Sequence, residues 1–207
     1  MKKILIIFFL LITIFPLHAQ KIGVSGSYFF MSGDMIGSNW ENSMPSVGAM
    51  LAIPAGKHEF IIDYEYADSR KDYVGYLGGG FLPGETEKES ITSYTYVNTL
   101  DIGYYHNLNQ LEFGRIFGGI GFTYMHFAGK KISVKDEEKS YPLNSEKYGA
   151  FITFGIGFEE MFDLPLALYT RMKFKYLLKL EETLDADAPY QNIGTIITPD
   201  IILAFSF

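Results

Sequence analysis

The sequence predicts an all-β fold, an eight-stranded antiparallel up-and-down transmembrane β-barrel, from three observations. After residue 20, apolar and polar residues alternate with a period of two in segment after segment, which is typical of strands with one apolar face. The connections between these segments are alternately short and long, as in barrels that cross a membrane. The chain also ends inside an alternating apolar segment, from Ile201 to Phe207.

The composition excludes several other classes of protein. Charged residues make up 20% of the 207 residues, aromatic residues 16%, and cysteine is absent. These values argue against a disordered chain, a coiled coil, a disulfide scaffold and thiolate metal centres. The formal charge of −7 disfavours nucleic acid as a partner. No cluster of metal-ligating residues stands out, so we expect no cofactor and no metal site.

The first residues have the pattern of an export signal. Lys2 and Lys3 precede an apolar run from Ile4 to Phe15, and Pro16 and Ala19 follow it. A basic start, a short apolar stretch and a small residue at the cleavage point define a secretory signal peptide. We therefore expect a signal peptide at residues 1–19, cleaved after Ala19, and one barrel domain at residues 20–207. The expected location is the cell outer membrane.

Eight segments carry the strand pattern. In the third and fourth, Ile62 and Tyr64 alternate with Asp63, and Leu100 and Ile102 alternate with Asp101 in the same way. The seventh alternates most regularly, with Arg171, Lys173 and Lys175 on one face and Met172, Phe174 and Tyr176 on the other. The predicted strands are 21–32, 46–53, 58–67, 91–106, 111–128, 148–159, 165–180 and 192–207.

The predicted connections divide into two groups. Short turns are expected at 54–57, 106–110 and 160–164. Longer polar or glycine-rich loops are expected at 33–45, 68–90, 129–147 and 181–191. Short turns at one end and long loops at the other end of the strands are the layout of a membrane barrel.

The alternation fits either a membrane barrel or a soluble lipocalin-like barrel, whose faces are reversed. The apolar face carries large residues and many tyrosines near strand ends, such as Tyr64 and Tyr104, as a membrane interface requires. The opposite face carries small residues, including Gly119, Gly121 and Gly155, which suit a narrow lumen. These observations favour the membrane barrel.

The signal peptide, the eight segments and the terminal run resemble the small outer-membrane barrels of the OmpA, OmpX and OmpW type. More narrowly, the chain resembles the outer-membrane β-barrel domain proteins of Bacteroidota, including PorT-like chains. The resemblance implies that Leu203, Phe205 and Phe207 form the signal that the barrel-assembly machinery reads. Pro199 departs from the pattern, and we expect a β-bulge there because proline cannot donate to the ladder.

The resemblance and the period of two place a set of charged side chains inside the barrel. We expect Asp101 to lie directly opposite Arg115, across a turn centred on Leu108. Such charges must be paired or hydrated. They form either a structural plug or a gated polar conduit. The set is Glu59, Asp63, Glu65, Asp101, Glu159 and Asp200 with Arg115, Arg171, Lys173, Lys175 and Lys179.

The loop expected at 68–90 is unusually apolar. We expect its side chains, with Trp40 of the first loop, either to fold over the barrel mouth or to contact a partner protein, a surface glycan or lipopolysaccharide. The candidate contact residues are Trp40, Tyr73, Tyr76 and Phe81.

Three functions remain open at this point. The first is a non-enzymatic integral outer-membrane protein that is structural or contacts partners through its long loops. The second, from the OmpW resemblance, is a small transport barrel for hydrophobic or small polar solutes. The third is a lipid A-modifying enzyme, although no local motif of such enzymes is visible.

Overall fold

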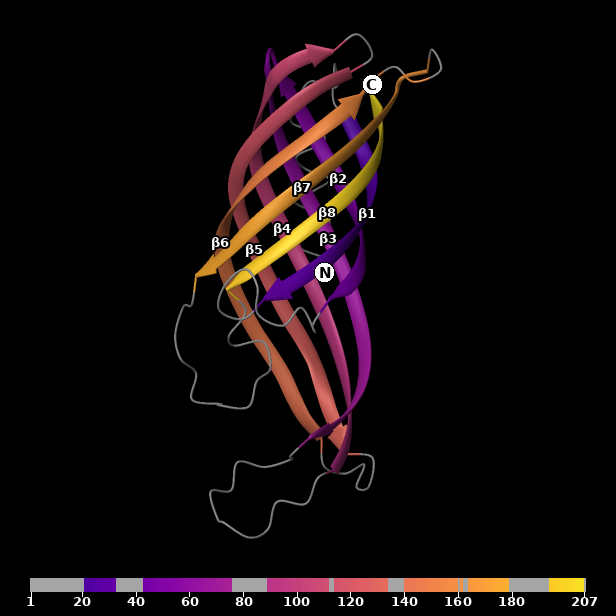
Figure 1. Cartoon of the computed structure of the whole chain (residues 1–207), viewed down its shortest axis with the longest axis vertical. Coiled ribbons are helices and arrows are strands. Elements are labelled where there is room, and N and C mark those ends of the chain that lie inside the picture. The colour runs from indigo at the N-terminus through magenta and orange to yellow at the C-terminus, as the bar shows by residue number, and fades with distance from the viewer. Residues whose placement is uncertain are drawn as a thin grey trace.

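The computed structural model is a closed barrel in which every strand pairs antiparallel with its neighbours in the chain, and β8 closes on β1 (Figure 1). This confirms the predicted fold class. The structure describes residues 21–32, 43–75, 89–111, 114–133, 140–159, 161, 164–178 and 194–206. The strands are β1 (Lys21–Ser32), β2 (Met44–Ala55), β3 (His58–Gly75), β4 (Glu89–Leu111), β5 (Gly114–Ser133), β6 (Ser140–Phe158), β7 (Leu166–Leu178) and β8 (Thr195–Ser206).

The described residues contain no helix long and apolar enough to cross a membrane.

The strand register fixes the stagger of the barrel. A row of paired residues starts at Lys21, passes through Ala52 and Ile61, and continues around the wall to Lys175 and Ile196. Ile196 pairs with Met31 of β1, so the row returns to its first strand ten residues beyond Lys21. Eight strands with this stagger tilt by about 35–45° and enclose a lumen that side chains can fill.

Four neighbouring strands are longer than the sequence predicts. β3, β4, β5 and β6 have 18, 23, 20 and 19 residues, whereas the other four have 12 or 13. Residues 68–75 and 89–90, predicted as loop, therefore extend β3 and β4, and residues 129–133 and 140–147 extend β5 and β6. In Figure 1 these four ribbons continue past the ends of the others. We call this extension the projecting sheet.

Two predictions about local backbone irregularity are wrong. No register shift occurs at Pro199, because β8 keeps one register with β1 and with β7 on both sides of it. The irregularity lies instead between Asn107 and Asn109, where the sequence predicts a turn. β4 continues through these residues to Leu111, and β5 begins at Gly114.

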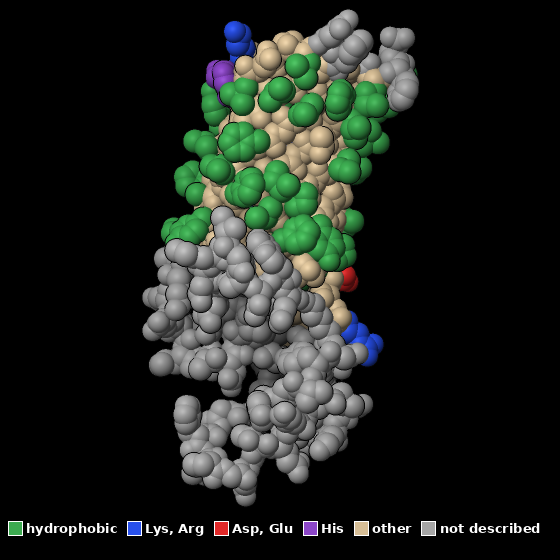
Figure 2. Space-filling view, viewed as in Figure 1, with side chains coloured by type: hydrophobic (Ala, Val, Ile, Leu, Met, Phe, Trp, Pro, Cys, Tyr) green, Lys and Arg blue, Asp and Glu red, His purple; other side chains and the backbone are tan. Residues whose placement is uncertain are grey.

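The two faces of the wall differ as the alternation predicts. Large apolar side chains point outward, including Phe122 at 76% exposure and Ile120 at 64%. Figure 2 shows such side chains spread over the wall, with charged side chains near the ends of the described part. The inward face alternates with this one, and most of its side chains are buried along β3 to β7. An apolar exterior of this extent fits a hydrocarbon surrounding.

Candidate functional site: the filled lumen

The lumen is filled by side chains in an ordered sequence of layers. Along β3, the inward residues from the short-turn end are Glu59, Ile61, Asp63, Glu65 and Ala67, all of them buried. The strand thus presents a charge, an apolar group, two charges and another apolar group. Because neighbouring strands carry a similar order, the layers extend across the barrel.

β7 has a similar order from the apolar group onward, with three charges in place of two. Its inward residues are Tyr169, then Arg171, Lys173 and Lys175, then Leu177. The two apolar positions belong to two separate clusters of buried residues, and the three cations lie between them. The lumen therefore holds ion pairs between two apolar layers.

At the short-turn end, four charged side chains form what we call the rim cluster: Lys21, Glu59, Arg115 and Glu159. Lys21 Nζ lies 2.9 Å from Glu59 Oε1 and 2.6 Å from Glu159 Oε1. Arg115 Nη2 lies 2.5 Å from Glu59 Oε2, and its Nε lies 3.2 Å from Glu159 Oε1. Two cations and two carboxylates alternate, so the cluster is formally neutral.

Glu159 directly follows the last residue of β6, and its side chain is the most exposed of the rim cluster. Its partial burial disfavours the charged form. The hydrogen bond and charge of Lys21, together with the charge of Arg115, outweigh burial and hold the pKa of Glu159 below its ordinary value of 4.5. The rim cluster therefore keeps this carboxylate ionised.

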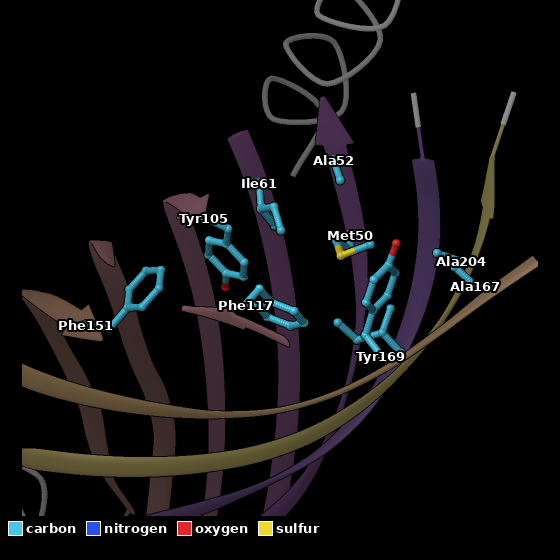
Figure 3. Close-up of a cluster of buried hydrophobic side chains, with 10 residues drawn as sticks. Met50, Ala52, Ile61, Tyr105, Phe117, Phe151, Ala167, Tyr169 and Ala204 are labelled. Atoms are coloured by element: carbon cyan, nitrogen blue, oxygen red, sulfur yellow. The ribbon is translucent and has the colours of Figure 1, made fainter. Parts of the chain in front are cut away.

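The next layer, which we call the aromatic layer, is built on pairs of one aromatic residue and one glycine. Figure 3 shows Tyr105, Phe117 and Tyr169 projecting into the barrel from different strands. Four inward aromatic rings each pair directly across the ladder with a glycine. The pairs are Tyr105 with Gly119, Phe117 with Gly155, Phe151 with Gly121 and Tyr169 with Gly157.

These glycines are needed because the rings lie over them. A Cβ atom on Gly119 would stand 2.6 Å from Cδ1 of Tyr105, and one on Gly157 would stand 2.6 Å from Cδ1 of Tyr169. Both separations are too short for carbon atoms. A cavity lined by Met50, Arg115 and Tyr169, among others, has a volume of only about 10 Å³, roughly the space of one water molecule.

Beyond the aromatic layer lies the central network of seven buried charged residues. Lys173 Nζ is 2.8 Å from Asp101 Oδ2 and 3.2 Å from Glu65 Oε1. Lys175 Nζ bonds the same two residues, 2.7 Å from Asp101 Oδ2 and 3.3 Å from Glu65 Oε2. The network consists of Asp63, Glu65, Asp101, Asp200, Arg171, Lys173 and Lys175.

Arg171 connects the central network to the aromatic layer. Its Nε donates to both carboxylate oxygens of Asp200, at 2.9 and 2.7 Å, and its Nη2 lies 2.8 Å from Asp63 Oδ2. Its Nη1 donates to the hydroxyl of Tyr105 at 3.0 Å. Four carboxylates face three cations in this network, and the cations make the contacts that offset the cost of burying them.

The layer nearest the long-loop end, which we call the outer apolar layer, closes the lumen on the long-loop side of the central network. Phe29 and Met125 are fully buried in it, and Phe127 is 1% exposed. Its members come from all strands except β6. They are Phe29, Met31, Met44, Ala67, Val97, Met125, Phe127, Leu177 and Ile196.

No family model and no curated protein matches the chain. The crystal structure of a major outer membrane protein from Thermus thermophilus matches with a TM-score of 0.58 and 13% identity, over 92% of this chain and 100% of that one. The chain has the fold of a small outer-membrane β-barrel.

Two further barrels of this fold match along nearly the whole chain. Neisserial surface protein A matches with a TM-score of 0.57 and 7% identity, over 91% of this chain and 97% of that one. Ail, the attachment invasion locus protein of Yersinia pestis, was solved with the heparin analogue sucrose octasulfate. It matches with a TM-score of 0.54 and 10% identity, over 91% and 98% of the two chains. Identities this low establish the fold alone.

Within this outer-membrane barrel fold, the expected contact between Asp101 and Arg115 does not occur. Asp101 pairs with Thr123 and Arg115 with Gln110. β4 continues past Leu108 to Leu111, which pairs with Gly114 of β5, so each residue of β4 meets a partner farther along β5 than expected. Asp101 instead contacts the lysines of β7, and Arg115 contacts Glu59 and Glu159.

The barrel places the predicted lumen charges in two groups. Glu59, Arg115 and Glu159 lie in the rim cluster. The other predicted charges among the described residues form the central network: Asp63, Glu65, Asp101, Asp200, Arg171, Lys173 and Lys175. Lys21 joins the rim cluster although sequence reasoning missed it. It is the first inward residue of β1, so extending the period of two to the start of that strand would have found it.

Other predicted site residues lie outside the described residues. These are Lys179, Phe207, Trp40, Tyr76, Phe81 and the signal peptide at 1–19. Tyr73, expected in a loop, belongs to β3 and pairs with Ile91. Leu203 and Phe205 point outward on β8, at 48% and 42% exposure.

Proposed function

We propose that the chain, after removal of residues 1–19, is a non-enzymatic integral protein of the outer membrane. It does not conduct solutes and contacts partners through its long-loop end. The observation that carries the proposal is the lumen, which four successive layers of side chains fill. The apolar exterior supports the location, because it requires a hydrocarbon surrounding.

The filled lumen argues against the transport alternative. A solute would have to displace the outer apolar layer, separate the ion pairs of Lys173, and then pass the rings of the aromatic layer. Separating buried ion pairs costs several kcal/mol for each charge left unpaired. A channel function would therefore require a large rearrangement of the interior.

The projecting sheet supports contact with a partner. β2 pairs with β3 only as far as Ala67, and β7 pairs with β6 only as far as Tyr148. Among the described residues, the remainder of β3 and β6 is paired on one side. Backbone edges of this kind accept an additional strand from another protein.

Planar-bilayer recording tests the closed lumen. The mature chain, prepared without a tag and shown to be folded by its heat-dependent mobility on a gel, is expected to give no stable conductance. A general porin in the same bilayer is the positive control. Reproducible single-channel steps from the folded chain would favour the transport alternative.

A glycan is the second candidate partner, on the strength of one feature of the projecting sheet. Arg70 and Lys130 pair with Tyr94 from either side on the outward face. The Arg70 guanidinium carbon lies 5.6 Å from the Tyr94 ring centroid and the Lys130 Nζ lies 5.9 Å from it. Two cations held against one ring suit a sulfated sugar such as the one bound to Ail.

Titration with sucrose octasulfate tests this second candidate. We expect binding that weakens when Arg70→Gln and Lys130→Gln are combined. The control is Lys57→Gln, which removes an exposed lysine at the opposite end of the barrel. Equal binding by the double variant and the control would exclude this site.

A further inference from the structure

Two histidines that are far apart in the sequence meet on the outer wall at the short-turn end. His58 is the first residue of β3, and it pairs directly with His106 of β4. Their Nδ1 atoms are 3.0 Å apart, and their ring centroids are 4.7 Å apart. Both side chains are partly exposed to solvent.

A third donor atom lies beside them. The hydroxyl of Tyr104 is 2.5 Å from the same Nδ1 atom of His58, and the two rings stack with centroids 4.9 Å apart. The backbone holds this arrangement, because the N–H of Asn107 donates to the carbonyl of Lys57 at 3.0 Å. Two imidazole nitrogens and a phenol oxygen are thus gathered at one place by the ladder.

We propose that His58, His106 and Tyr104 form a binding site for a divalent transition-metal ion, with Cu²⁺ preferred over Zn²⁺. Two nitrogen ligands at about 2.0–2.1 Å from one ion, at square-planar or tetrahedral angles, are about 2.8–3.4 Å apart. The 3.0 Å between the Nδ1 atoms lies in this range. The 2.5 Å between the Tyr104 hydroxyl and Nδ1 of His58 is shorter, so the hydroxyl moves away from that nitrogen when it joins the ion. The ion takes the place of the proton that the two imidazoles share.

The donor set determines which ion is preferred. Imidazole nitrogen suits copper, zinc and nickel, and affinity for a given site is highest for Cu²⁺ among the divalent first-row metals. Among the described residues, no group of three or more His, Cys, Asp and Glu side chains is placed to hold a metal. Water therefore completes the coordination, and the ion exchanges with solvent.

The site is independent of the filled lumen. All three side chains are on the outward face, whereas the charges of the lumen are inside the wall. A chain that binds no metal would therefore contradict the metal site but not the proposed non-conducting barrel. A chain that conducts would contradict the non-conducting barrel but not the metal site.

Calorimetric titration with CuCl₂ and with ZnCl₂ tests the proposal on the full mature chain, folded in detergent, stripped with chelator and free of a histidine tag. We expect one saturable Cu²⁺ site in the unmodified chain and weaker Zn²⁺ binding at the same site. His58→Asn and His106→Asn should each abolish it, and Tyr104→Phe should weaken it. The control is His126→Asn, which alters a histidine bonded to Asn144 elsewhere on the wall.

Two further measurements make the result decisive. The electron paramagnetic resonance spectrum of bound Cu²⁺ should show coupling to two nitrogens, and Cu²⁺ should raise the urea midpoint of the unmodified chain but not that of His58→Asn. Gel mobility before heating confirms that each variant is folded. The proposal is overturned if the folded unmodified chain binds no Cu²⁺ saturably. It is equally overturned if the His58→Asn, His106→Asn double variant binds normally, or if His126→Asn alone removes the site.

Discussion

Lys173 is the side chain on which most of the central network depends. Its ammonium group is fully buried and lies within 3.4 Å of Asp63, Glu65 and Asp101. A buried charge is tolerated only when its partners offset the loss of hydration. Removing this lysine leaves three buried carboxylates without one of their cationic partners and should lower the free energy of unfolding. Removing an exposed lysine should change that free energy little.

We expect Lys173→Met to lower the free energy of unfolding by about 3–5 kcal/mol, because it leaves uncompensated buried carboxylates. Lys57→Met, at an exposed turn, should change it by less than about 0.5 kcal/mol. Urea unfolding from lipid vesicles measures both values.

The double variant Lys173→Met, Asp101→Asn should be destabilised by less than the two single changes added together, because it leaves fewer orphan charges. Strict additivity would contradict the coupling of these residues across the lumen.

The rim cluster makes stability depend on pH in a defined direction. The pKa of Glu159 is held below 4.5 in the folded chain. The contribution of ionised Glu159 to the free energy of unfolding is therefore fully present above about pH 4.5. It is lost as pH falls through the lowered pKa. We expect the stability difference between the unmodified chain and Glu159→Gln to be constant from about pH 7 to 5.5 and to shrink below about pH 4.5. A difference that grows on acidification would show that this pKa is raised.

Residue-level reasoning from the sequence could predict the face of a side chain but not its partner. The period of two placed Asp101 and Arg115 inside the wall, where both are buried. Their partners depend on where the β4–β5 turn falls and on the stagger of the whole barrel. Neither quantity is encoded in the local pattern around the two residues, so the pairing expected between them was wrong.

At the scale of elements, β5 and β6 fit together because a ring on one strand takes the space of a missing side chain on the other. Phe151 of β6 pairs with Gly121 of β5. A Cβ atom on Gly121 would stand 2.5 Å from Cζ of Phe151 and would also meet the carbonyl oxygen of Ile102. The carbonyl belongs to the backbone and cannot turn away.

Gly121→Ala is therefore expected to destabilise the barrel by about 1–3 kcal/mol through overpacking. Gly26→Ala is the matched control, because a Cβ on that outward glycine of β1 meets no atom within 4 Å. Chemical unfolding of both variants from the same vesicles measures the difference. Equal stability of the two variants would contradict the close packing of Phe151.

The outward Phe205 of β8 and the terminal Phe207 of the sequence make a separate prediction about assembly. If the terminal strand is the assembly signal, Phe205→Ser combined with Phe207→Ser should reduce the amount of chain recovered in outer membranes. Phe158→Ser is the control, because Phe158 is also outward and similarly exposed, 38% against 42% for Phe205, but lies on β6. A similar loss in the control would mean that the aromatic surface matters and the terminal position does not.

The number and order of the elements could be predicted from the sequence, because each strand carries its own alternation. The extension of β3 to β6 into the projecting sheet could not be predicted in this way. Residues such as Asp68, Arg70 and Lys130 are polar on an outward face, so the apolar alternation stops there although pairing continues. Backbone pairing does not need an apolar face once the strands have left the membrane.

At the scale of the whole molecule, the position of a charge along the barrel axis should decide its cost. Phe122 is outward, 76% exposed and in the middle of the apolar wall, whereas Tyr96 lies nearer the long-loop end. We expect Phe122→Lys to cost about 2–4 kcal/mol and Tyr96→Lys about 0–1 kcal/mol in lipid vesicles. Equal costs at the two sites would contradict the placement of the membrane.

Pro199 has a mechanical consequence for the closed wall. β1 and β8 are the two ends of the described chain, and their ladder has no pairing at Tyr28 and Phe29, beside the proline that lacks an N–H. On its other side Pro199 pairs normally with Met172. The ladder between the two ends of the described chain is therefore interrupted in its middle. Thermal opening should begin there, with amide hydrogens of β1 exchanging before those of β4 and β5.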